Sequence, residues 1–284
     1  MSRIEKALEL AAQMRTGAPQ AAPQTAPQAA PQAAPAEKVA LAARQGSSRT
    51  VTINAGNRLL ATVSDPHSAV SEQFRKLKSR VLQQTKGDRL RNILMVTSAS
   101  TGEGKSLTAT NLAISLAQEY DLTVLLVDAD LRRPSIHRYL GFEQGIGLSD
   151  CLLDGIDIGD AINRTDLGKL TVLTAGREVE KPLELFASKK MQELMAEIKN
   201  RYADRYVIID TPPLLPFAET RSLAHLVDGV VFVIREGATS KECVHEAMEV
   251  LKGCPILGVV LNESTAVSPE NSYYGEYYGR QKAL

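Results

Sequence analysis

Residues 97–106 read TSASTGEGKS, and this stretch decides the fold. An apolar run, 93–96 (ILMV), precedes it, and a helical pattern follows it. Its ending, Gly104-Lys105-Ser106, is how a phosphate-binding P-loop finishes, because glycines let backbone N–H groups point at a phosphate and the following helix N-terminus adds its dipole. The pattern GxxxxGK[ST] wants glycine where this chain has Ala99. The context still predicts a nucleotide site, with an ordinary glycine-rich turn as the alternative.

Apolar runs alternate with helical patterns along the rest of the chain. We expect strands at 92–97, 123–128, 170–174, 206–210, 229–234 and 256–261. Helical patterns fall at 68–84, 105–119, 184–200 and 240–252. Such alternation predicts an α/β fold with a buried, mostly parallel sheet flanked by helices. Ligands in such sheets bind at the carboxyl ends of the strands, where the polar motifs of this chain fall.

Two of these strand ends carry carboxylates. VLLVDADLRRP contains Asp128 and Asp130, and YVIIDTPP contains Asp210. A carboxylate after four apolar residues at the rim of a sheet is costly unless it has a task. We expect Lys105 to reach the β- and γ-phosphates and the Ser106 hydroxyl to ligate Mg²⁺. Asp210 then fits a Walker B role in holding the metal through water. Capping of a helix is the alternative for Asp128 and Asp130.

Changes in composition divide the chain into four parts. Residues 1–16 can form an amphipathic helix that docks on a partner protein or a membrane surface, with a frayed tail as the alternative. Residues 17–63 form an Ala/Pro/Gln-rich, disordered linker and a loosely structured segment with a strand at 51–53. Residues 64–265 form the P-loop domain, and 266–284 form a flexible, tyrosine-rich tail.

Composition excludes several classes of function. The chain has 284 residues and a formal net charge of zero, so nothing in it indicates nucleic-acid binding. Its three cysteines share no metal-ligand spacing. No apolar run reaches the ~20 residues of a membrane span, and the start has no secretory signal. We therefore expect a soluble, cytoplasmic protein.

Taken together, the three motifs resemble the Walker A, Walker A′ and Walker B motifs of bacterial tyrosine kinases (BY-kinases). These kinases belong to the deviant-Walker branch of the P-loop NTPases, together with partitioning and septum-positioning ATPases. The positioning ATPases carry a signature lysine where this chain has Ser100. The absence of glycine at 99 is common in BY-kinases, and Thr101 stands where many of them have proline. The nucleotide-binding residues are expected to be Ala99, Ser100, Thr101, Gly102, Glu103, Gly104, Lys105, Ser106, Leu107 and, as an adenine contact or a turn residue, Asn262.

The resemblance implies an ATP-dependent protein-tyrosine autokinase that uses ATP and Mg²⁺. It makes Asp128 the acceptor of the tyrosine proton and adds Asp130 to the metal site formed by Ser106 and Asp210. Lys105 completes the catalytic set. We expect Arg132 or Arg133 to orient the incoming tail or a phosphate.

Two flanking features agree with the family. Glu72, Arg75 and Lys78 are similar to its ExxRxxR oligomerisation motif, with lysine in the last place; a solvated face with local charge pairs is the alternative. The tail SYYGEYYG resembles its tyrosine cluster, which makes Tyr273, Tyr274, Tyr277 and Tyr278 the expected autophosphorylation sites.

The family also implies partners and a location. A ring-shaped homo-oligomer and a cognate tyrosine phosphatase are expected. The N-terminal helix and spacer resemble the version of the kinase associated with exosortase-type exopolysaccharide loci. There, a membrane-embedded chain-length regulator (polysaccharide co-polymerase) activates the kinase and would hold it at the inner face of the cytoplasmic membrane.

Two other readings stay open from the sequence. One is a deviant-Walker ATPase that hydrolyses ATP to position or gate a membrane partner without phosphorylating protein. The second is a nucleotide-gated adaptor without enzymatic activity. Ser100 and the tyrosine tail speak against the first. Phosphate on the tail would exclude both.

Overall fold

The computed structural model describes residues 49–86, 91–201 and 205–265. The chain divides into two units, 1–43 and 44–284, and every described residue belongs to the second. The predicted helix at 1–16, the Pro-rich spacer and the tail at 266–284 therefore lie outside the described residues. No helix in the described part is long and apolar enough to cross a membrane.

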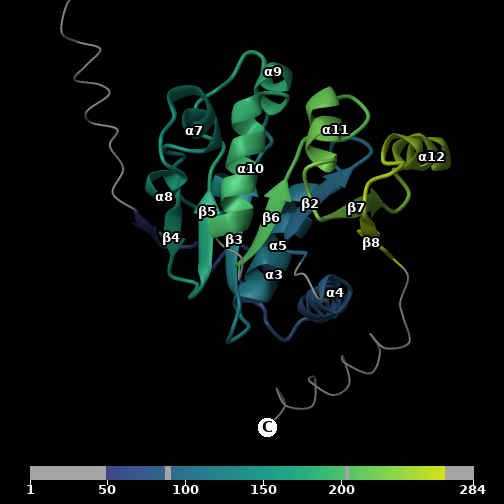
Figure 1. The fold of residues 1–284 in the computed structure, drawn as a ribbon. Helices are drawn as coiled ribbons and strands as arrows, with labels where there is room; N and C mark the ends of the chain where they lie inside the picture. Colours follow the sequence, from purple (N-terminus) through teal and green to yellow (C-terminus); the bar gives the residue numbers. More distant parts are fainter. Residues whose placement is uncertain (1–48, 87–90, 202–204, 266–284) are drawn as a thin grey trace, which may run out of the picture. The chain divides into compact units, whose positions relative to one another are not determined.

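A single sheet of eight strands forms the centre of the described domain (Figure 1). Its order is β1-β4-β5-β3-β6-β2-β7-β8, and every pair is parallel except β4–β5. The strands are β1 Thr50–Val51, β2 Ile93–Ser98, β3 Thr123–Asp128, β4 Asn163–Thr165, β5 Leu170–Leu173, β6 Arg205–Asp210, β7 Gly229–Arg235 and β8 Ile256–Asn262. The predicted α/β fold with a mostly parallel sheet is confirmed.

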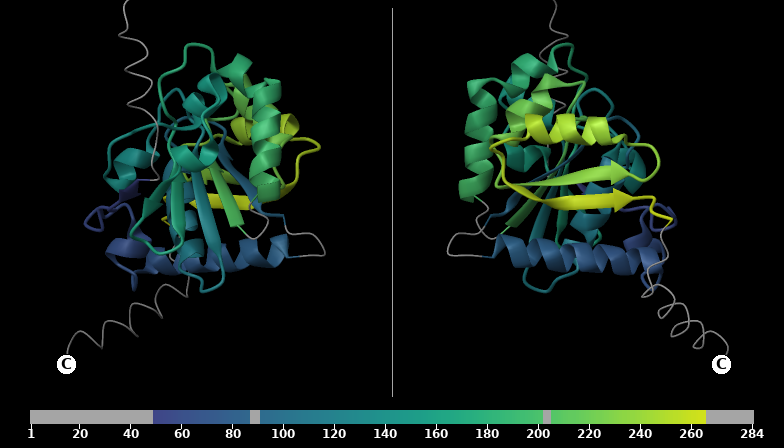
Figure 2. Two further views of the ribbon diagram at one scale, coloured as in Figure 1. Left: turned by 60° about the vertical axis from the view of Figure 1, so that its left-hand side comes forward. Right: turned by 90° about the vertical axis from the view of Figure 1, so that its right-hand side faces the viewer.

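Helices cover both faces of the sheet, as the two views of Figure 2 show. On one face lie α3 (Ala61–Ser64), α4 (Ala69–Thr85), α5 (Lys105–Ala117) and α6 (Ile136–Leu140). On the other face lie α7 (Leu148–Asp154), α8 (Ile158–Ala161), α9 (Pro182–Phe186), α10 (Lys189–Arg201), α11 (Ala218–Ala224) and α12 (Lys241–Val250). The sheet is thus the middle of three layers.

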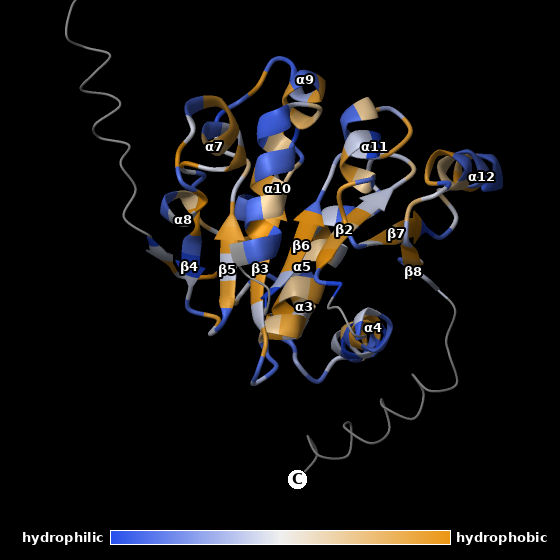
Figure 3. Ribbon diagram, in the orientation of Figure 1, coloured by the Kyte–Doolittle hydropathy of each residue, from blue (hydrophilic) through white to orange (hydrophobic). Residues whose placement is uncertain are grey.

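Alternate side chains along the strands pack into two separate hydrophobic cores, one on each face of the sheet. On β2, Ile93 and Met95 join the core beneath α10, whereas Leu94 and Val96 join the core beneath α5. All four side chains are almost fully buried, which is why the central strands read as unbroken apolar runs. Figure 3 shows the same pattern as a band of hydrophobic residues through the middle strands.

The observed elements differ from the expected ones in three places. The helix expected at 184–200 is two helices, because the chain breaks after α9 and the Ser188 hydroxyl accepts from Met191 N at the start of α10. Residues 49–63, expected to be loosely structured, pack on the domain: β1 pairs with β4, and Leu60 is fully buried. The described domain therefore begins ahead of the predicted boundary at 64.

The third difference concerns β8, which was expected to be buried like the other strands. It is the last strand of the sheet, and none of its residues is fully buried. Val259 is 54% exposed and Leu261 is 52% exposed. An edge strand lacks a neighbour on one side, and periodicity alone does not distinguish it from a central strand.

Candidate functional site

The order of the strands brings the three sequence motifs to one place. β2, which leads into the glycine-rich loop, lies beside β6, and β6 lies beside β3. Val96 pairs in register with Asp210, and Asp210 pairs with Asp128. Because parallel strands end at the same edge, both carboxylates stand level with the loop that begins after Ser98.

The glycines of the loop have conformations that other residues rarely adopt. Gly102 and Gly104 have φ of +78° and +89°. A Cβ on Gly104 would lie 2.0 Å from Asn262 Nδ2, so both backbone angle and space require glycine there. Ala99 is fully buried, and among the described residues the only non-glycine with positive φ is Glu263. Position 99 therefore needs no glycine, which explains the departure from the P-loop pattern.

Glu103 braces the loop from within. Its side chain is almost fully buried, accepts a hydrogen bond from Ser100 N at 3.0 Å and another from the Thr239 hydroxyl at 2.5 Å. Its backbone oxygen accepts from Asn262 Nδ2 at 3.0 Å. The sequence placed Glu103 and Asn262 among the nucleotide contacts, and the structure gives both a role in holding the loop's shape. Nothing in the sequence pointed to Thr239.

Lys105 is the cation at the centre of the site. Its ammonium donates to Asp130 Oδ2 at 2.9 Å and lies 3.7 Å from Asp210 Oδ1. The Ser106 hydroxyl is 3.1 Å away. Burial alone would lower the pKa of Lys105, but Asp210 and Asp130 outweigh burial and raise that pKa. The lysine therefore stays charged.

Asp128 is fully buried and held by backbone donors. Its carboxylate accepts from Asp130 N at 3.2 Å, Ser135 N at 3.0 Å and Ile136 N at 3.1 Å. The last two donors open helix α6, so the capping alternative is part of its structural role. Burial, and next the charge of Asp210, raise the pKa of Asp128 to about 7 against the lowering effect of these donors. Near neutral pH this carboxyl can hold or release a proton.

In the described part of the chain, the Asp210 carboxylate lacks hydrogen bonds of the kind that hold Asp128. Both of its oxygens are buried, and neither has a hydrogen-bond partner among the described residues. Burial raises the pKa of Asp210 to about 6, with the charge of Lys105 opposing it. The Lys105 ammonium at 3.7 Å offsets part of the cost of burying this carboxylate, and a metal ion or its water shell would offset more of it.

The donor set fits a nucleotide with Mg²⁺. Asp210, Asp130 and the Ser106 hydroxyl are hard oxygen ligands beside a phosphate-binding loop, and Mg²⁺ is bound by one or two carboxylates together with phosphates and water. Within the described residues, no group of three or more His, Cys, Asp or Glu forms a metal cage by itself.

Arg132 makes a contact that the sequence did not indicate. Its Nε donates to Glu219 Oε1 at 2.5 Å, and its guanidinium lies 4.7 Å from the centre of the Phe217 ring. Glu219 is almost fully buried, so the pair ties the loop after β3 to the first turn of α11. Arg133 is exposed, its backbone N–H donates to Asp130 Oδ1 at 3.1 Å, and no contact of its side chain is seen among the described residues, so its predicted role stays a prediction.

The predicted oligomerisation residues lie on α4, and their charges are paired within the chain. Arg75 Nε donates to Glu72 at 2.6 Å, and Arg75 Nη1 donates to Pro66 O at 2.8 Å. Lys78 pairs with Glu119. Tyr273, Tyr274, Tyr277 and Tyr278 lie outside the described residues, so their predicted role stays a prediction.

Comparison with known proteins gives consistent relatives. Residues 89–283 match the ParA family described as "NUBPL iron-transfer P-loop NTPase". The chain is 39% identical over 228 residues to "Tyrosine-protein kinase YwqD" of Bacillus subtilis, which covers 78% of this chain and 94% of that protein. It is 31% identical to "Succinoglycan biosynthesis transport protein ExoP" of Rhizobium meliloti over 78% of this chain and 28% of that longer protein.

Solved structures agree with these relatives. The kinase domain of Escherichia coli tyrosine kinase ETK matches with a TM-score of 0.66 and 30% identity, covering 74% of this chain and 83% of that one. The septum site-determining protein MinD of Pyrococcus horikoshii, solved with Mg-ADP, matches with a TM-score of 0.52 and 25% identity over 65% of this chain and 76% of that one. Identity and fold similarity are thus both higher for the kinase domain.

Proposed function

Because this chain belongs to the bacterial tyrosine kinases, a branch of the ParA-type P-loop NTPases, we propose that it phosphorylates its own tail. The phosphoryl donor is ATP with Mg²⁺, and the acceptors are Tyr273, Tyr274, Tyr277 and Tyr278. The observation that supports this most is Asp128, a buried carboxyl with a pKa of about 7 beside the phosphate loop.

The chain's own groups account for each part of the transfer. The tyrosine oxygen forms a bond to the γ-phosphorus, the bond from that phosphorus to the β–γ bridging oxygen breaks, and ADP leaves. Lys105 and the backbone N–H groups of 102–106 stabilise charge on the transferred group. Mg²⁺, held by Ser106, Asp130 and Asp210, would supply further charge neutralisation when bound.

The tyrosine proton goes to Asp128. A carboxylate offers about four acceptor positions, and three backbone N–H groups already bond to this one. About one position is left for the substrate. A free tyrosine has a pKa of roughly 10, so an acceptor with a pKa near 7 becomes useful as the O–P bond forms.

Regulation of exopolysaccharide or capsule synthesis or export is the biological role that we propose. It is supported by the relative whose name includes succinoglycan biosynthesis and transport, which aligns with this chain over 28% of its own length. The remaining partners follow the same proposal. A membrane-embedded chain-length regulator activates the kinase at the inner face of the membrane, a ring forms through Glu72, Arg75 and Lys78, and a phosphatase reverses the modification.

Mass spectrometry after incubation with γ-labelled ATP tests the activity. We expect phosphate on the peptide that contains 273–278, and no labelling in Lys105→Met. Lys189→Met is the matched control, because this lysine is exposed on α10 and pairs only locally with Glu193. Label that appears only as free phosphate would favour an ATPase that positions a partner. Label on the tail of Lys105→Met would overturn the site.

A further inference from the structure

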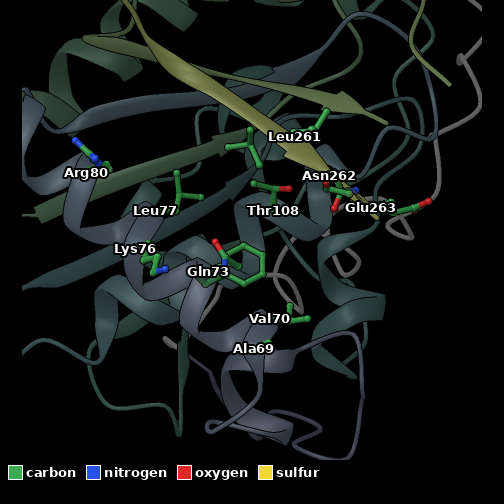
Figure 4. Close-up of a pocket in the computed structure, with 13 residues that line it drawn as sticks. Ala69, Val70, Gln73, Lys76, Leu77, Arg80, Thr108, Leu261, Asn262 and Glu263 are labelled. Atoms are coloured by element: carbon green, nitrogen blue, oxygen red, sulfur yellow. The ribbon is translucent and has the colours of Figure 1, made fainter. Parts of the chain in front are cut away.

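A groove runs between α4 and the edge strand β8, on the same side of the sheet as the phosphate loop. It has a volume of about 720 Å³ and is lined along α4 by Val70, Phe74 and Leu77. Figure 4 shows Val70, Lys76 and Arg80 along the helix, across from Leu261 and Glu263. A second hollow of about 320 Å³ shares Leu77 and Arg80 and continues the groove toward Leu257. The combined surface follows most of the helix.

This groove combines an apolar surface with an open strand edge. Val70 is 54% exposed, which matches the exposure of Leu261 and Val259 on β8. β8 has a neighbouring strand on one side only within the described sheet. Proteins usually cover or interrupt such an edge, because its free N–H and C=O groups pair readily with another strand.

The chain itself leads into the groove. Glu263 and Ser264, which follow β8 directly, line its mouth, and the 19 residues 266–284 continue from there. From Thr265 to Tyr277 an extended chain reaches at most about 40 Å at ~3.3 Å per residue. From Val70 to Arg80, ten steps along α4, the helix rises about 15 Å at ~1.5 Å per step. The tail is therefore long enough to turn back and place its tyrosines beside Lys76 and Arg80.

The chemistry of the groove matches a phosphorylated tyrosine better than an unmodified one. Phosphotyrosine has an aromatic ring and carries roughly −1.5 to −2 charges. Lys76 and Arg80 supply positive charge among the apolar side chains, and Arg80 has no ion-pair partner among the described residues. Arginine binds phosphate with two parallel hydrogen bonds.

We propose that the groove between α4 and β8 docks the chain's own tail, residues 266–284, once its tyrosines carry phosphate. The proposal rests on the proposed function for the source of the phosphate. Glu72, Arg75 and Lys78 are three residues apart on α4 and lie on the face of the helix away from the groove, so docking and the predicted ring use different faces. Thr108 and Asn262 also line the groove, so a docked tail lies beside the phosphate loop and away from a neighbour's site.

Hydrogen–deuterium exchange of the full chain tests this docking. Phosphotyrosine is installed at 277 by genetic code expansion, so the result does not depend on the chain's own kinase activity. We expect exchange in 256–262 and 69–80 to slow several-fold relative to the unmodified chain. Arg80→Glu should weaken docking about tenfold or more, because a charge-assisted bond to phosphate is lost and a like charge replaces it. Lys86→Glu, at the C-cap of the same helix and outside the groove lining, should keep the protection.

Each other outcome contradicts the proposal. Unchanged exchange in the phosphorylated chain means that the groove does not bind the tail. Protection that persists in Arg80→Glu means that phosphate is not recognised there. Protection that grows with protein concentration assigns the groove to a second copy, and protection lost on removal of residues 1–48 assigns it to the N-terminal segment. Tail labelling by ATP is scored separately, so failure of the kinase and failure of docking are distinguishable.

Discussion

The carboxyl end of the central strands and the outer edge of the sheet are opposite kinds of surface. At the centre, Asp128 and Asp210 are buried carboxylates, and Asp210 has no hydrogen-bond partner among the described residues. At the edge, Val259 and Leu261 are apolar side chains that remain half exposed. In the first region Asp210 lacks hydrogen-bond donors among the described residues although Lys105 lies 3.7 Å away, and the second region lacks an apolar cover. What is missing in each region indicates what it should bind. The carboxylates would be compensated by a metal-bound nucleotide, and the exposed apolar side chains would be covered by an aromatic segment.

Stability should respond very differently to the same truncation in the two regions. Leu94→Ala on β2 removes a fully buried side chain and should lower the free energy of unfolding by about 3 kcal/mol. Leu261→Ala on β8 should cost less than about 1 kcal/mol, because this side chain is 52% exposed. Urea unfolding of both variants measures the contrast. Equal losses would mean that the edge is covered in solution.

Asp210→Asn should lower activity and raise stability. Loss of a carboxylate that holds a metal through water typically costs about 10–100-fold in activity. In the nucleotide-free protein the same change removes a buried charge without a hydrogen-bond partner, so the free energy of unfolding should increase by about 1 kcal/mol. Kinase assays and thermal unfolding measure the two effects. Asp154→Asn, at an exposed pair with Arg177, is the control, and a less stable Asp210→Asn would contradict the account.

Gly104→Ala separates backbone strain from lack of space. Left-handed φ costs a non-glycine residue about 1–2 kcal/mol. Gly253 has the same φ of +89° as Gly104 but open space around its Cα, so Gly253→Ala reports the strain alone. Gly104→Ala should destabilise the protein further and weaken binding of a fluorescent ATP analogue, because its Cβ meets Asn262. Equal effects of the two substitutions would show that Asn262 moves aside freely.

The contrast between the regions also explains what could be predicted from the sequence. The sequence places the ends of β3 and β6 correctly, and that of β2 within one residue, because an apolar run that leads into a polar motif marks a buried parallel strand with a polar carboxyl end. β8 has the same type of sequence, yet its side chains stay partly exposed because it is the last strand of the sheet. Which strand lies at the edge depends on the topology of the whole domain, and an apolar run does not reveal it.

Contacts between distant segments were beyond the sequence for the same reason. Glu219 comes 87 residues after Arg132, and Thr239 comes 136 residues after Glu103. Neither Glu219 nor Thr239 belongs to a recognised motif. The segments that carry these residues meet because β3, β6, β2 and β7 lie in that spatial order.

The pH dependence of stability tests the buried charges of the central region directly. Folding raises the pKa of Asp128 to about 7 and of Asp210 to about 6, above the ordinary value of 3.8. Between these limits the folded protein keeps protons that the unfolded chain has released, so stability falls as pH rises from about 4 through 7. The urea midpoint should therefore be lower at about pH 8 than at about pH 5.5, by the equivalent of about 2–3 kcal/mol at roughly 1.4 kcal/mol per pKa unit. Mg-ADP should flatten this decrease, because the metal compensates the carboxylates, and Asp210→Asn should flatten it without ligand. A decrease that is as steep in Asp210→Asn as in the unaltered chain would place its cause outside the phosphate site.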